Sequence, residues 1–174
     1  MSNLLQKLTA IKAFLFDMDG VLTDGSVYLL PNGVVARAMN TKDGYALQRA
    51  TSGGFIVAII SGGDSSEAIE RFSKLGITEI HMKVHDKMKV MHEIMERNNL
   101  LPHEVLAMGD DIPDIPIMKA AGVSAAPNDA VLEVREISSY ISPYGGGKGC
   151  VRDVIEKVMK CKGLWDQHVF TTSS

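Results

Sequence analysis

Short, almost uninterrupted apolar runs constrain the fold of this chain more than any other feature of its sequence. The wholly apolar stretch 13–16, for example, leads directly into an acidic turn. Strands of a parallel sheet show this pattern because helices cover both of their faces. The predicted strands span residues 11–17, 55–61, 104–110 and 122–127, with shorter ones at 79–82 and 139–142.

Helical patterns alternate with these runs along the chain. The predicted helices span residues 42–52, 64–75, 87–99, 114–121, 128–136 and 149–162. Asp64 and Asn128 stand where the N-terminal caps of the second and fifth helices belong. Such alternation predicts an α/β fold, a Rossmann-like doubly wound parallel sheet. No linker or internal repeat interrupts it, so we expect a single domain over residues 1–174.

One insertion, residues 26–40, breaks the alternation. Asn32 and Gly33 stand between two apolar arms and predict a β-hairpin, because both residues tolerate positive φ. An exposed apolar hairpin tends to associate with other chains. We therefore predict a homotetramer in which the hairpins pack together. The alternative is a hairpin that folds back over its own domain.

Charge and cysteine content narrow the class of protein. The net charge of −3 offers no basic surplus for nucleic acid. No apolar run approaches the roughly 18 residues that suggest a membrane span. The two cysteines form no CxxC motif, and the N-terminus lacks signal-peptide features. We therefore expect a reduced, cytoplasmic protein with neither a nucleic-acid nor a membrane partner.

Acidic residues follow two of the predicted strands. Asp17 and Asp19 come directly after the first run, and Asp110, Asp111 and Asp114 follow the third. Because the carboxyl ends of parallel strands meet at one edge of a sheet, these side chains should share a mouth. Neighbouring carboxylates repel unless a cation lies between them or one is protonated, and hard oxygen ligands suit Mg²⁺. The alternative for the second group is a helix N-terminus enriched in Asp.

Residues suited to an anion occur between the two acidic groups. The second strand ends in Ser61, and Gly62 with the next glycine leaves backbone N–H groups free to approach a phosphate. Lys87 opens a later helix, where it can neutralise developing charge. Two alternatives stay open: Ser61 as a helix-capping hydroxyl, and Lys83 or Lys89 in place of Lys87. The five histidines show no ligand spacing, so we expect them at the surface or in packing.

The segments "DMDGVLTDG", "IISG" and "GDDIPD", with Lys87 before the last, resemble the four motifs of the haloacid dehalogenase (HAD) superfamily, in the family's order. The resemblance implies that Asp17 is the nucleophile and forms an aspartyl phosphate. It makes Asp19 the general acid and then the base. Ser61, Gly62 and Lys87 would bind phosphate oxygens.

The same resemblance implies a metal site. Asp17, the backbone carbonyl of Asp19 and the side chain of Asp110 would hold Mg²⁺, which neutralises charge on the phosphoryl group. Asp114 would stand behind these ligands and orient Lys87 or a metal-bound water. Asp111 would stand behind them too, or would simply contact solvent.

The spacing of the motifs leaves no room for a cap domain. Within the superfamily, this cap-less form, the hairpin, "NTKDGYALQ" (40–48) and "YGGGKGCVRDVIE" (144–156) resemble the 3-deoxy-D-manno-octulosonate 8-phosphate phosphatases. The resemblance implies Mg²⁺-dependent hydrolysis of that sugar-acid phosphate for lipopolysaccharide precursor synthesis. The alternative substrate is a nine-carbon ulosonate 9-phosphate of the sialic-acid type. The residues expected to contact the substrate are Thr41, Lys42, Asp43 and Lys148.

The second motif departs from that family's pattern. Many members carry a basic residue after it that reaches the substrate, whereas here Gly63 and Asp64 follow Gly62. The substrate carboxylate must then find positive charge elsewhere. Two other interpretations stay open: a signalling receiver domain, against which the order of the acids and the lysine argues, and a catalytically silent HAD fold. The sequence does not decide the role of the tail 168–174.

Overall fold

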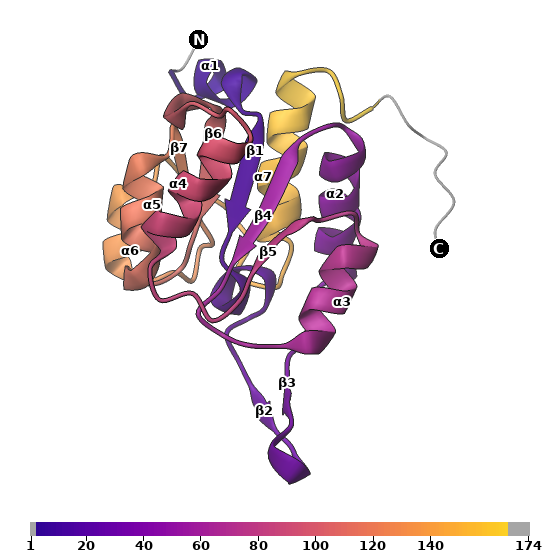
Figure 1. Cartoon of the computed structure of the whole chain (residues 1–174). Coiled ribbons are helices and arrows are strands. Elements are labelled where there is room, and N and C mark those ends of the chain that lie inside the picture. Colours follow the sequence, from indigo (N-terminus) through magenta and orange to yellow (C-terminus); the bar gives the residue numbers. More distant parts are fainter. Residues whose placement is uncertain (1–2, 167–174) are drawn as a thin grey trace.

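The computed structural model describes residues 3–166, with a six-stranded parallel sheet at its centre (Figure 1). The strand order is β5-β4-β1-β6-β7-β8. The strands are β1 (Ala13–Phe16), β4 (Ile56–Ile60), β5 (Glu79–His81), β6 (Val105–Met108), β7 (Val123–Ala126) and β8 (Tyr140–Ile141). All six predicted runs form strands, and every pairing between them is parallel, which confirms the predicted doubly wound sheet.

Seven helices of the described residues cover the two faces of the sheet. They are α1 (Asn3–Ala10), α2 (Thr41–Ser52), α3 (Ser66–Lys74), α4 (Lys87–Arg97), α5 (Ile115–Ala120), α6 (Leu132–Ile137) and α7 (Cys150–Cys161). Helices α1, α2, α3 and α7 pack on one face, and α4, α5 and α6 pack on the other (Figure 1). The sequence analysis did not predict α1.

Residues of β1 alternate between the two apolar layers. Phe14 and Phe16 face the layer of α2, α3 and α7, and their rings stack with centroids 5.9 Å apart. Ala13 and Leu15 face the layer of α4, α5 and α6. All four side chains are fully buried, and burying one large apolar side chain contributes about 1.5–3 kcal/mol. The strand that leads into the acidic turn is therefore anchored on both sides.

Two helix caps differ from the prediction. Ser65 caps α3, because its hydroxyl accepts the N–H of Ala68 at 3.1 Å, while the Asp64 carboxylate pairs with the Lys83 amine at 2.8 Å. Asn128 does not begin α6, which starts only at Leu132, and the Asn128 amide instead donates to the carbonyl of Pro143 at 2.6 Å. In both places a tertiary contact takes the side chain expected to cap.

The predicted hairpin projects away from the body of the molecule (Figure 1). Its strands β2 (Tyr28–Leu29) and β3 (Val35–Ala36) pair antiparallel, and Asn32 at the tip has φ 63°. The Leu29 side chain is 80% exposed. Most of the apolar arm residues are exposed, namely Val27, Tyr28, Leu29, Leu30, Val34 and Val35. The hairpin therefore does not fold back over its own subunit, which removes that alternative.

Helix α7 closes the fold beside the acidic turn. The thiol of Cys150 is buried and donates to the carbonyl of Val21 at 3.2 Å. The N–H of Gly147 donates to the same carbonyl at 2.9 Å, so the glycine-rich loop before α7 braces the turn. Among residues 3–166, no helix combines the length and apolar character that a membrane crossing requires. The tail 168–174 lies outside the described residues.

Candidate active site

Asp17 follows the last residue of β1 and begins a kinked turn. The turn continues through Gly20, whose φ of +91° is one that residues with a side chain rarely adopt. A β carbon at Gly20 would overlap the carboxylate of Asp110. The hydroxyl of Thr23 accepts the N–H groups of Gly20 and Gly25 at 3.3 and 3.2 Å, which fixes the turn. The glycine after the two acids therefore makes room for the second acidic group.

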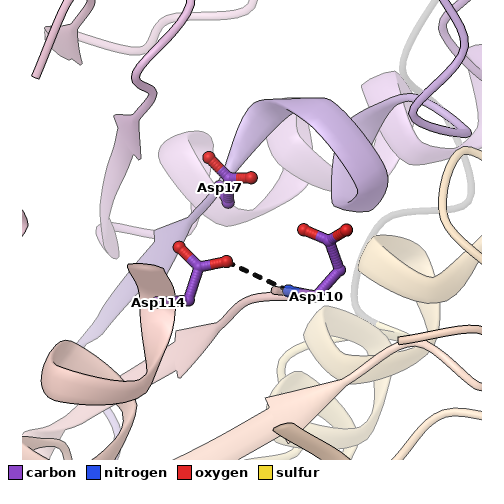
Figure 2. Close-up of side chains that lie close together, drawn as sticks. All are labelled: Asp17, Asp110 and Asp114. Carbon is purple, nitrogen blue, oxygen red and sulfur yellow. Dashed lines mark hydrogen bonds between the residues drawn. The ribbon is translucent and has the colours of Figure 1, made fainter. Parts of the chain in front are cut away.

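Asp110 and Asp114 come from the connection between β6 and α5. Because β6 pairs with β1 in register, with Met108 beside Phe16, this connection leaves the sheet next to Asp17. One oxygen of the Asp114 carboxylate accepts the N–H groups of Asp110 and Asp111 at 3.1 and 3.4 Å. Figure 2 shows Asp17, Asp110 and Asp114 gathered in this way. One oxygen from each lies within 4.8 Å of the others.

Lys87, the first residue of α4, links two of these acids. Its amine donates to Asp17 Oδ1 at 2.8 Å and to Asp114 Oδ1 at 2.6 Å. The alternatives do not reach the cluster: the Lys83 amine pairs with Asp64, and Lys89 is exposed. The structure thus brings Lys87, and neither alternative, to the acidic group.

Burial and mutual repulsion shape the charge of the cluster. Burial first, and then the nearby Asp114 carboxylate, raise the pKa of Asp17 to about 6 against the partial relief that Lys87 gives. Burial, with Asp17, Asp114 and Asp111 nearby, raises the pKa of Asp110 to about 7. Burial alone would lower the pKa of Lys87, but the carboxylates of Asp17 and Asp114 outweigh it and raise that pKa. The cluster carries an excess of negative charge that a cation would relieve.

Ser61 follows the last residue of β4, next to β1. Its buried hydroxyl accepts the N–H of Gly63 at 3.1 Å, so it orders its own loop and does not cap α3. Ser61, Gly62, Asp17, Asp19 and Lys87 line one cavity of about 870 Å³. Asp110, Asp111 and Asp114 line the same cavity. All predicted catalytic, phosphate and metal residues therefore meet at one place.

Two residues of the site were not foreseen. His85 lines the cavity, two residues before Lys87. Its side chain is exposed, which agrees with the surface position expected for it, but the sequence analysis gave it no place in the site. Arg37, at the base of the hairpin, pairs with Asp19: Nε lies 2.7 Å from Oδ1 and Nη2 lies 3.2 Å from Oδ2. The proximity of His85 to Lys87 was a usable signal, whereas no local pattern marks Arg37.

The four residues expected to contact the substrate lie elsewhere. Thr41, Lys42, Asp43 and Lys148 do not line the cavity of the acidic cluster. Asp43 corrects the prediction most clearly, because it is 1% exposed and its carboxylate accepts the N–H groups of Gly149 and Arg152 at 3.2 and 2.7 Å. It caps α7 and has no free face for a ligand.

The acidic cluster fits a small, hard cation. Asp110 Oδ1 is buried and has no hydrogen-bond partner among the described residues. Both oxygens of Asp114 are already engaged, whereas Asp17 and Asp110 keep oxygens for a further ligand. An unpaired buried carboxylate oxygen is costly, and oxygen donors of this kind are those that Mg²⁺ prefers.

Comparisons with known proteins show which family this chain belongs to. A profile of the haloacid dehalogenase-like hydrolases matches residues 69–152. The chain is 31% identical over 166 residues to the 3-deoxy-D-manno-octulosonate 8-phosphate phosphatase KdsC of Escherichia coli K12, covering 95% of this chain and 88% of that protein. Salmonella typhi KdsC shows the same identity and coverage.

Solved structures of phosphatases from the same family also match this chain. The crystal structure of the 3-deoxy-D-manno-octulosonate 8-phosphate phosphatase from Yersinia pestis matches with a TM-score of 0.92 and 30% identity, over 94% of this chain and 88% of that one. The enzyme of that name from Moraxella catarrhalis, solved with magnesium, phosphate and KDO, matches with a TM-score of 0.92 and 31% identity, over 95% of each chain. The chain therefore belongs to the haloacid dehalogenase-like hydrolases, in the family of the 3-deoxy-D-manno-octulosonate 8-phosphate phosphatases.

Proposed function

We propose that this chain is a magnesium-dependent phosphatase that hydrolyses 3-deoxy-D-manno-octulosonate 8-phosphate to the free sugar acid and phosphate. The observation that carries the proposal is the meeting of Asp17, Asp110 and Lys87 in one cavity at the carboxyl edge of the sheet. The reaction would serve lipopolysaccharide precursor synthesis. Membership of a hydrolase family removes the receiver interpretation, and an intact acidic cluster argues against a silent fold.

Asp17 is the proposed nucleophile. A carboxylate oxygen of Asp17 attacks phosphorus, a P–O bond to Asp17 forms, and the P–O bond to the sugar breaks. Asp19, at the mouth of the same cavity, protonates the departing sugar oxygen. Asp19 then takes a proton from the water that hydrolyses the aspartyl phosphate. The near-complete burial of Asp17 supports this, because it keeps competing water away from the nucleophile.

Ser61, Gly62 and Lys87 are the proposed phosphate-binding residues. The Ser61 hydroxyl and the backbone N–H of Gly62 supply donors, and the Lys87 amine supplies positive charge. The ion pairs of Lys87 with Asp17 and Asp114 support this role, because they hold the amine beside the nucleophile before substrate arrives.

The proposed magnesium ligands are Asp17, the backbone carbonyl of Asp19 and the side chain of Asp110. When bound, Mg²⁺ would neutralise negative charge that develops on the phosphoryl oxygens. Asp114 and Asp111 support these ligands: Asp114 holds the backbone of its loop and the amine of Lys87, and Asp111 Oδ1 accepts the N–H of Ile112 at 2.7 Å.

Organisation and location complete the proposal. We assign residues 1–174 to a single HAD-like hydrolase domain with the hairpin insertion 26–40, in the cytoplasm. The exposed apolar arms of the hairpin support a homotetramer in which hairpins pack together. Thr41, Lys42 and Lys148 are exposed, and none of them lines the cavity of the acidic cluster in the same subunit. We therefore assign them a substrate contact only across a subunit boundary.

A nine-carbon ulosonate 9-phosphate is the second candidate substrate. Positions 63 and 64 carry Gly and Asp where many members of the family carry a basic residue that reaches the substrate. This difference supports the nine-carbon compound as an alternative substrate. Both substrates carry a carboxylate and a primary phosphate. A comparison of kcat/KM for the two compounds decides between them.

Phosphate release tests the proposal directly. The purified protein should release inorganic phosphate from 3-deoxy-D-manno-octulosonate 8-phosphate with Mg²⁺, and excess chelator should abolish the release. Asp17→Asn should lower turnover by at least about a thousandfold, because the amide is a poor nucleophile, while the far-ultraviolet spectrum stays unchanged. Retention of most activity in Asp17→Asn would place the nucleophile elsewhere, and no release by the unmodified protein would refute the function.

A further inference from the structure

The guanidinium of Arg37 donates two parallel hydrogen bonds to the carboxylate of Asp19. Nε lies 2.7 Å from Oδ1 and Nη2 lies 3.2 Å from Oδ2. This fork-to-fork arrangement fixes both the position and the plane of a carboxylate, which a single contact does not. The Arg37 side chain is 11% exposed and the Asp19 side chain 32% exposed. The pair therefore lies where the base of the hairpin meets the rim of the cavity.

The loop after β4 is shaped to receive this pair. A β carbon at Gly63 would lie 3.0 Å from Asp19 Oδ2 and 3.2 Å from Arg37 Nη2, closer than ordinary contacts allow. Any side chain at position 63 would press on both partners. Gly63, Asp19 and Arg37 thus form one packed unit, built from three separate segments of the chain.

The remaining contacts of Asp19 are too weak to hold it alone. The Thr23 hydroxyl lies 3.4 Å from Asp19 Oδ1, at the long end of the hydrogen-bond range. Arg37 Nη1 is buried without a hydrogen-bond partner among the described residues, which is a cost to the folded state. Arg37 thus holds the carboxylate of Asp19, which the proposed chemistry needs at the rim, although one of its nitrogens stays unpaired. A role in function explains this arrangement better than a role in stability does.

We propose that Arg37 is a positioning residue for Asp19, and this inference rests on the proposed function. The fork of Arg37 uses two of the carboxylate's lone pairs and leaves the others for proton transfer. Proton transfer requires Asp19 within hydrogen-bond reach of the departing sugar oxygen. Without Arg37, the partly exposed side chain would turn toward solvent and lose that reach.

The test compares two leaving groups. For Arg37→Ala, kcat/KM for the sugar phosphate should fall by at least about tenfold, whereas kcat/KM for p-nitrophenyl phosphate should change by less than about threefold, because nitrophenolate leaves without a proton. The ratio kcat/KM is the right quantity because it reports the steps up to departure of the leaving group. Equal losses on both substrates would overturn the proposal.

A double-mutant cycle separates action through Asp19 from direct contact with substrate. If Arg37 acts only through Asp19, then Arg37→Ala should change the sugar-phosphate activity of Asp19→Asn by less than about twofold. An undiminished loss in the Asp19→Asn background would overturn the proposal, since Arg37 would then act on the substrate or on the fold.

Two further variants protect the test against misfolding. Arg37→Lys keeps the charge but not the fork, so it should show a smaller loss with the same preference for the sugar phosphate. Arg97→Ala removes a comparable two-contact ion pair, with Glu79 on β5, and should leave the ratio of the two activities unchanged. If the unmodified protein released no phosphate at all, the proposed function would fail. If it is active and Arg37→Ala keeps the ratio, only this inference fails.

Discussion

The acidic edge of the sheet and the hairpin are built on opposite plans. At the edge, Asp17 follows a fully buried strand and Asp114 is tied by two backbone N–H groups, so the core fixes the positions of both acids. In the hairpin, two strands of two residues each pair with one another and, within residues 3–166, with no other strand, and Leu29 is 80% exposed. The comparison indicates that the chain places its chemistry on rigid elements and leaves association to a projecting one.

The ion pair between Arg37 and Asp19 joins the two regions. Arg37 follows the second strand of the hairpin, and its guanidinium holds Asp19 at the rim of the cavity. The hairpin is therefore more than an interface, because its base reaches the acidic edge. The expected outcomes below test how separate the two regions are.

The largest effect is expected from a comparison of alanine substitutions at two glycines that both have positive φ. Gly20 and Gly33 have φ of +91° and +76°, but a β carbon would overlap Asp110 at the first and meet nothing within 4 Å at the second. Gly20→Ala should lower phosphatase activity by about a hundredfold, because small displacements of reacting groups are this costly. Gly33→Ala should leave activity unchanged and cost only the backbone strain of about 1–2 kcal/mol.

Activity assays and denaturant unfolding of both variants check this contrast. Urea midpoints should fall for both proteins, and more for Gly20→Ala. A loss of activity in Gly33→Ala comparable to that of Gly20→Ala would show that the tip of the hairpin takes part in the chemistry, and the comparison would break.

Assembly gives the next effect. Leu29→Asp places a charge in the exposed apolar arm, so it should convert the proposed tetramer to smaller species in sedimentation velocity. Leu132→Asp changes an exposed leucine of α6 and should leave the assembly intact. A monomeric unmodified protein at micromolar concentration, or a tetrameric Leu29→Asp, would contradict the proposed role of the hairpin.

The smallest effect concerns pH and magnesium. The pKa values of Asp17 and Asp110 rise from 3.8 to about 6 and about 7 in the folded, metal-free protein. Between pH 3.8 and these raised pKa values, the folded state therefore binds more protons than the unfolded state. The stability that the two groups contribute is lost as the pH rises through about 4 to 7. Magnesium binds the deprotonated acids, so its stabilising effect should grow over the same range.

Thermal melts with and without Mg²⁺ at pH 5 and pH 8 measure this difference. The rise in Tm should be larger at pH 8, and Asp110→Asn should reduce the contrast. A rise in Tm that is equal at both pH values would show that the cluster does not take up protons in place of the cation. Hairpin variants such as Gly33→Ala should keep the contrast, because the hairpin supplies none of these acids.

The sequence was enough to predict the sheet and the acidic edge. Continuous apolar runs identify parallel strands, and the topology of such sheets places their carboxyl ends together, so Asp17 and Asp110 could be paired across more than 90 residues. The hairpin could be predicted equally well, because Asn32-Gly33 between apolar arms is a local signal. These predictions succeeded where one residue pattern decides the structure.

Other features depend on tertiary contacts that no local pattern encodes. Asp43 reads as a polar residue near the mouth, yet it caps a helix more than 100 residues later in the chain. Asp64 reads as a cap but pairs with Lys83. Arg37 directly follows β3 and begins the irregular segment 37–40, where neither helical nor strand periodicity predicts the direction of its side chain. Positions of this kind follow only from the assembled fold.

The insertion of β6 beside β1 has a consequence for biosynthesis. Asp17 is made more than 90 residues before its partners at 110 and 114, and one edge of β1 stays uncovered until residues 105–108 are available. A nascent chain that stops before this point holds neither a complete cation site nor a closed core. Ligand-dependent protection against proteases should therefore arise only after residues 105–114 have been made, and the unpaired edge of β1 is the segment that chaperones would need to shield until then.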